Sequence, residues 1–335
     1  MSSLPTTTLR VASMLFKPRR GATADNVAGV VAAIERAARN GVELAVFPEA
    51  CLTGGIGDTA SSDARRTRRT ALRELAQGID SAPVLAVADA VERTGVAAGV
   101  GLIEAAPNGD LFSSYVVCLP GGERHVHRKL QPDGERHLAR GDRFTVFDTH
   151  WGWRLAILIG GDNYLVENAR MAALLGARLL VAPHARTGAI DAASSEWMRR
   201  ALPARAIDNG MFVVYSDGAC DGIQAGEDAG EDADENAGEG GAAAIVDPCG
   251  QVIAQDGQDP RGDDMIVADL DPALIGTSPG HRWLDARRPD LYARLATGRA
   301  REMPLDARAF EPRTASARGS VPVSFAMVRR ERSQG

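Results

Sequence analysis

The chain has 335 residues, of which 44% are apolar and 5% aromatic, and this composition is that of a globular protein with room for a substantial core. Lysine and arginine total 38 against 44 acidic residues, for a formal net charge of −6, which gives no support to a nucleic-acid partner. No apolar run is long enough to span a bilayer and no secretory signal pattern is visible, so we expect a cytoplasmic protein without a membrane partner.

Short strand-like runs alternate with helical patterns along most of the chain, which predicts an α/β architecture. In the first half we expect strands at 9–15, 44–47, 96–103, 115–119 and 126–128, and helices at 24–39, 65–75 and 84–93. The helix at 24–39 repeats apolar residues at helical spacing, with Thr23 as its expected N-cap and Gly41 just past its end.

The second half repeats the alternation without sequence repetition. We expect strands at 144–147, 155–159, 179–182, 212–215, 243–246 and 265–270, and helices from about 167, at 196–207 and at 283–295.

Two segments lack the apolar residues of a packed element. Residues 225–241 are acidic and rich in glycine and alanine, so we expect a mobile loop, with a metal-binding acidic loop as the alternative. Residues 297–335 are rich in arginine and poor in periodic pattern, and we expect a tail that docks on a partner subunit or stays disordered. The predicted domain is therefore 1–296.

The four cysteines, Cys51, Cys118, Cys220 and Cys249, lie far apart and form no CxxC pair. Free thiols in a reducing compartment explain them better than disulfides or a zinc site.

Gly160 stands where an α/β enzyme would hold its nucleophile. It follows the apolar strand pattern 155–159 and precedes a turn and then a helix. Such a junction exposes one side chain beside free N–H groups at a helix start. Glycine has no side chain to expose, so the reactive atom of this arrangement is missing.

Three charged residues also follow or flank strand patterns: Glu49 after Pro48, Lys129 after 126–128, and Glu135 in a polar loop. A carboxylate at the end of a buried strand is suited to general base catalysis, and a lysine there can stabilise an oxyanion. Each alone could equally be a surface residue.

Taken together, these segments resemble the nitrilase, or carbon–nitrogen hydrolase, superfamily. The resemblance lies in the order and spacing of 47–49, 128–130, 134–135 and 162–170, and extends over about 9–292. It implies a four-layered α-β-β-α sandwich that pairs with a second subunit, as a homodimer or larger homo-oligomer. It also implies hydrolysis of a small amide or nitrile through a cysteine, and no metal or organic cofactor.

The resemblance further assigns roles to matching positions. The residue matching Glu49 is the general base, that matching Lys129 stabilises the tetrahedral intermediate, and that matching Glu135 orients the site. The family cysteine falls at Gly160. Cys51 is the nearest other thiol, and we interpret it as a packed one.

Four further residues are expected to line the substrate. The N–H of Gly161 would complete the oxyanion pocket with Lys129, and Tyr164, His184 and Arg186 would form the substrate wall. His184 is equally explained as a structural histidine.

Three hypotheses remain open. The chain is an amidase- or nitrilase-type enzyme without its nucleophile, as an engineered or natural variant; or an enzyme with altered chemistry in which Glu49 activates water; or a catalytically dead binding or regulatory subunit. Retention of Glu49, Lys129 and Glu135 favours the two enzyme hypotheses.

Overall fold

The computed structural model describes residues 4–54, 62–132, 137–186, 189–219, 242–256, 265–292 and 295. Within these ranges, only the backbone is described for 62–68, 186, 189–197 and 219. The chain divides into two units, residues 1–287 and 288–335. The described part of the second unit contains a short 3-10 turn, Pro289–Leu291, in which Arg288 pairs with Asp290 at 2.7 Å.

Two six-stranded sheets form the centre of the first unit. The first sheet has the order β12-β1-β2-β3-β4-β5 and the second β11-β10-β9-β8-β7-β6. The strands β1, β2 and β3 are parallel to one another, as are β7, β8 and β9, and the remaining pairings are antiparallel. The bounds in the first sheet are Met265–Leu270, Leu9–Met14, Leu44–Val46, Ala97–Ala105, Leu111–Cys118 and Arg124–Arg128, in that order. Those in the second are Val252–Gln255, Ala243–Val246, Phe212–Ala219, Leu179–Arg186, Arg154–Ile157 and Thr145–Asp148.

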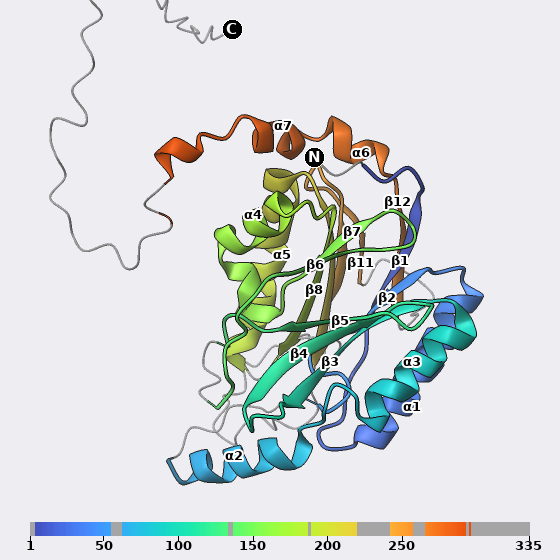
Figure 1. Cartoon of the computed structure of the whole chain (residues 1–335), viewed down its shortest axis with the longest axis vertical. Helices are drawn as coiled ribbons and strands as arrows, with labels where there is room; N and C mark the ends of the chain where they lie inside the picture. Colours follow the sequence, from blue (N-terminus) through green and yellow to red (C-terminus); the bar gives the residue numbers. More distant parts are fainter. Residues whose placement is uncertain are drawn as a thin grey trace, which may run out of the picture. The chain divides into compact units, whose positions relative to one another are not determined.

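Helices cover the outer face of each sheet (Figure 1). The helices α1 (Thr23–Arg39) and α3 (Ala82–Thr94) pack on the first sheet, and α4 (Val166–Leu174) and α5 (Ala189–Asn209) pack on the second. The other helices are α2 (Ser62–Leu75), α6 (Ala273–Thr277) and α7 (Pro279–Asp285).

The strands are apolar on both faces because each face is buried. In β8, Leu179 and Val181 belong to the cluster between the sheets, whereas Leu180 belongs to the cluster under α4 and α5. Consecutive strand residues point to opposite faces, so a strand between two buried layers reads as a continuous apolar run. The same alternation in β2 sends Leu44 and Val46 between the sheets. These layers confirm the predicted four-layered α-β-β-α sandwich.

Several predicted boundaries are wrong. The helix predicted at 283–295 is α7, which begins earlier and ends at Asp285. Ser278 caps its start by accepting from the backbone N–H of His281, and Pro279 occupies the first turn. Pro289 keeps the preceding residue out of the helical region, which prevents continuation.

Two smaller differences concern α1 and β11. Thr23 lies inside α1, and Ala22 holds the N-cap position without a side-chain hydrogen bond. The strand β11 was not predicted, because its face is largely exposed and its four residues show no strong alternation.

Two predicted segments, 225–241 and 297–335, lie outside the described residues, so the domain boundary near 296 stays a prediction. Among the helices that are described, none has the length and apolar character needed to cross a membrane.

Candidate active site

Glu49 lies just past the end of β2, where the two sheets meet. Its backbone N–H donates to the carbonyl of His184 in β8 at 3.1 Å, which ties the two sheets together at this point. The next residue, Ala50, has a left-handed φ of 53°, a conformation that costs a non-glycine residue free energy and is found at functional turns.

Gly101 in β3 allows this turn to approach closely. A Cβ built on Gly101 would clash with the backbone nitrogen of Ala50 and lie 2.9 Å from Cα of Glu49. The glycine therefore determines how the backbone of Glu49 is seated against β3.

The Glu49 carboxylate forms a buried ion pair with Lys129. Its Oε1 accepts from Lys129 Nζ at 2.9 Å and from Ser113 Oγ at 2.6 Å. The two charged residues are only 4% and 7% exposed, so little water screens this Glu49–Lys129 pair. Ser113 also accepts the backbone N–H of Lys129 through its carbonyl at 2.9 Å, so one residue of β4 positions both members of the pair.

Gly160 lies beside the Glu49–Lys129 pair. It follows β7 and begins a 3-10 turn, Gly160–Tyr164, with a left-handed φ of +47°. A Cβ built on Gly160 would lie 2.9 Å from Glu49 Oε2 and 3.1 Å from Lys129 Nζ. Any side chain at position 160 would therefore begin between the carboxylate and the ammonium.

Asp162 fixes the turn that carries Gly160. Its buried carboxylate accepts the N–H of Ile159 at 3.0 Å and that of Gln131 at 2.7 Å, and its Oδ2 lies 3.4 Å from His127 Nε2. Because Gln131 is two residues after Lys129, this one carboxylate links the turn at 160 to the segment that carries the lysine.

His184 lies next to the pair and forms a buried dyad with Asp217. Its Nδ1 is 3.2 Å from Asp217 Oδ1. Burial lowers the pKa of His184, but the hydrogen bond and charge of Asp217, together with the charge of Glu49, raise it above the ordinary 6.5 overall. The charges of Glu49 and Lys129 both act on this ring, so it belongs to the same polar cluster.

The other predicted site residues are placed differently. Gly161 is the second residue of the 3-10 turn. Tyr164 packs against the apolar cluster beneath α4 and α5, and its carbonyl accepts from Arg205. Arg186 ends β8, with its side chain outside the described residues, and Glu135 lies wholly outside them. The roles of these four residues stay predictions.

Cys51, the alternative thiol, is buried in the cluster beneath α1 and α3. Its Sγ accepts the N–H of Gly101 at 3.3 Å.

Two residues of the cluster carried no signal in the sequence. Ser113 and Asp217 lie in largely apolar strands, each next to a serine, Ser114 and Ser216 respectively. Their importance depends on which strands lie adjacent, and that follows from tertiary structure rather than from local pattern.

Comparisons with known proteins agree with this architecture. The family model described as carbon-nitrogen hydrolase matches residues 10–279. A protein of Pseudomonas protegens named hydrolase in pqqF 5′ region is 29% identical over 298 residues, covering 86% of this chain and 92% of its own length. An aliphatic nitrilase of Sinorhizobium fredii is 27% identical over 255 residues, covering 71% of this chain and 78% of its own.

A solved amidase from Nesterenkonia shares the fold with a TM-score of 0.62 at 21% identity, over 88% of this chain and 100% of that chain. With a family model that matches most of its length and a sandwich of the same fold, this chain belongs to the carbon–nitrogen hydrolase family.

Proposed function

We propose that the cluster around position 160 is a carbon–nitrogen hydrolase site for a small amide or nitrile. The observation that carries the proposal is the direction of the missing side chain, since a Cβ at 160 would lie 2.9 Å from Glu49 Oε2 and 3.1 Å from Lys129 Nζ. A nucleophilic atom carried on that Cβ would begin beside a base and beside a cation that can stabilise the developing negative charge.

The proposed roles follow from the charges. Glu49 Oε2 faces position 160 and takes a proton, while Oε1 stays hydrogen-bonded to Lys129 and Ser113. Lys129 stabilises the negative charge that develops on the carbonyl oxygen, or on the nitrile nitrogen, when the adjoining carbon is attacked, with the N–H of Gly161 as the second donor. Glu135 orients the site, and Tyr164, His184 and Arg186 line the substrate.

Glycine at position 160 limits the reactions that this site can catalyse. Without a thiol no covalent thioester forms at residue 160, and attack on the substrate must come from water activated by Glu49. Loss of one member of a catalytic triad in a different family leaves roughly 10³–10⁴-fold acceleration over water. Retention of a buried Glu49–Lys129 pair, which is unfavourable to keep unless it is used, supports residual function at this site.

A product screen tests the proposal. Wild type, Gly160→Cys and Glu49→Gln proteins are incubated with a panel of small amides and nitriles, and acid and ammonia release is measured. We expect Gly160→Cys to hydrolyse at least one member, and any wild-type turnover to disappear in Glu49→Gln. A folded Gly160→Cys protein that releases no product from the whole panel would contradict the proposal.

A catalytically dead binding or regulatory subunit is the second candidate, and the absence of a side chain at residue 160 is the observation that favours it. Such a protein would bind a small ligand without turnover. Calorimetry separates the two candidates: ligand binding that is unchanged in Glu49→Gln, with no product at any pH, would favour the binding protein.

We further propose a homodimer or larger homo-oligomer. Large apolar side chains on and beside α4 are between 38% and 54% exposed, and exposed apolar side chains gathered on one element are typical of an interface. They are Leu165, Val166 and Met171. Sedimentation of wild type and Met171→Glu tests this, because a charge within an interface should shift the protein toward the monomer.

A further inference from the structure

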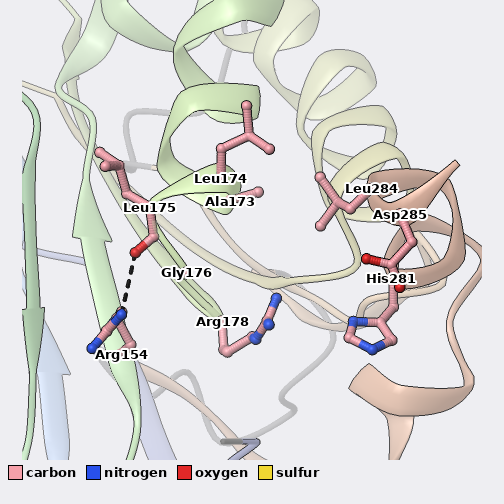
Figure 2. A pocket seen from close by; sticks show the side chains of 9 residues that line it. All are labelled: Arg154, Ala173, Leu174, Leu175, Gly176, Arg178, His281, Leu284 and Asp285. Atoms are coloured by element: carbon pink, nitrogen blue, oxygen red, sulfur yellow. Dashed lines mark hydrogen bonds between the residues drawn. The ribbon is translucent and has the colours of Figure 1, made fainter. Parts of the chain in front are cut away.

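A pocket separate from the candidate active site lies at the C-terminal end of α4 (Figure 2). It has a volume of about 190 Å³, and its polar lining consists of Arg154, Arg178, His281 and Asp285. Arg154 begins β7, whereas Gly160 follows its end at Ile157, so the two sites lie at opposite ends of this strand.

Arg178 reaches into this pocket with unsatisfied donors. It is 6% exposed, and its Nε and Nη1 are buried without a hydrogen-bond partner among the described residues. Its backbone is held on both sides, since its N–H donates to Arg154 and its carbonyl accepts from Phe212. A buried guanidinium with open donors is unfavourable unless an acceptor occupies the space beside it.

The neighbouring charges do not neutralise Arg178. Arg154 adds a second positive charge, and Asp148 already pairs with Arg154 through two contacts of 2.7 Å. Burial and the charge of Arg154 lower the pKa of Arg178, and Asp285 raises it only in part. Within the described part of the chain, no carboxylate lies at ion-pair distance from Arg178.

His281 adds a further ring nitrogen without a hydrogen-bond partner in the described part of the chain, from the opposite wall of the pocket. Its Nδ1 is buried and has no hydrogen-bond partner among the residues that the structure describes. Figure 2 shows this ring on α7 facing the end of Arg178, with Asp285 above it. Leu174 and Leu284 complete the wall with apolar surface.

We propose that this pocket binds a small oxyanion, either a carboxylate or a phosphate, held chiefly by Arg178. An oxyanion accepts several hydrogen bonds from arginine and neutralises its charge. The volume of about 190 Å³ accommodates a ligand of this size with its remaining waters. The apolar wall suits the short hydrocarbon part of an organic acid.

Thermal denaturation at constant ionic strength tests the site, with sodium phosphate and sodium acetate as probes and sodium chloride as reference. We expect phosphate or acetate to raise the melting temperature of wild type above its value in chloride, because a ligand that binds the native state stabilises it. Which probe acts distinguishes the phosphate from the carboxylate class.

The decisive variant is Arg178→Met, with Arg10→Met as its matched control. Arg10 is a half-exposed arginine that pairs with Asp269 on the first sheet, so the control removes the same charge elsewhere. Arg178→Met should bind the active probe at least about tenfold more weakly, and Arg10→Met should respond as wild type does. Arg178→Met should also be no less stable than wild type in chloride, because it removes an unpaired buried charge.

Two results would overturn the proposal. One is a wild-type melting temperature that neither probe changes; destabilisation of Arg178→Met in chloride would then assign the arginine to the carbonyls at the end of α4. The other is an equal response of wild type and Arg178→Met. If Arg178→Met does not fold, Arg178→Lys replaces it, with weakened but measurable binding as the expected result.

Discussion

Replacing Lys129 by methionine should destabilise the protein strongly, because Glu49 would be left as a buried carboxylate without its cation. The two side chains are 2.9 Å apart and almost fully buried, and breaking such a pair from one side costs about 3–5 kcal/mol. Ser113 alone would remain on Oε1, at 2.6 Å. For a chain of this size we expect a fall in melting temperature of roughly 4–7 °C.

The chain offers a close control, because Lys17 is its only other lysine and is exposed. Lys17→Met should change stability by less than about 0.5 kcal/mol. Thermal and urea denaturation of both variants measures the difference.

The double variant Glu49→Gln, Lys129→Met isolates the pair from the other contacts of Lys129. Removing both charges should restore a substantial part of the lost stability, since no buried charge is then unpaired. If the double variant is as unstable as the sum of the two single variants, the pair is not energetically coupled and the reasoning is refuted.

Three further predictions concern the surroundings of the site. The pKa of His184 is raised in the folded protein, so its interaction with Asp217 stabilises the protein fully at a pH below the unfolded-state pKa, and this stabilisation is lost as the pH rises through the folded-state pKa. Asp217→Asn should therefore lower the free energy of unfolding more at pH 5.5 than at pH 8, as measured by denaturation curves. An equal loss of stability at both pH values would contradict the dyad. Burial raises the pKa of Cys118 to about 11, so iodoacetamide at pH 8 should alkylate it about two orders of magnitude more slowly in the native than in the unfolded protein; equal rates by peptide mass spectrometry would count against this burial. Gly101→Ala should cost about 1–3 kcal/mol, because the added Cβ meets the backbone at Ala50; an unchanged urea midpoint would show that this turn is not seated as described.

The sequence was informative wherever burial imposes a continuous local pattern. Residues 44–46 and 179–182 lie in strands with both faces covered, so their apolar runs are visible without tertiary information. The short strand 252–255 has an exposed face and gave no such signal. The helix predicted through 295 is wrong because Pro289 holds Arg288 outside the helical region, although the apolar residues beyond it have helical spacing.

Some residues of the candidate site could likewise be predicted from local sequence patterns, and others could not. Glu49 and Lys129 could be named because each follows a strand and matches a family motif, and the left-handed φ of Gly160 fits the strand–turn–helix pattern. Ser113 and Asp217 could not be named, because their roles come from neighbouring strands distant in sequence. Arg178 was invisible as a site residue, since an unpaired buried charge is a property of the packed structure alone.

The most direct test of the central claim is the intact mass of the Gly160→Cys protein after exposure to small amides and nitriles. The left-handed φ of +47° makes this side chain cost about 1–2 kcal/mol, which Gly160→Ala shares, so the alanine variant is the matched control. We predict a covalent acyl or thioimidate adduct on residue 160 in the cysteine variant and none in the alanine variant. A thiol at residue 160 that reacts with iodoacetamide yet forms no adduct with any amide or nitrile would contradict the assignment of this cluster as a carbon–nitrogen hydrolase site.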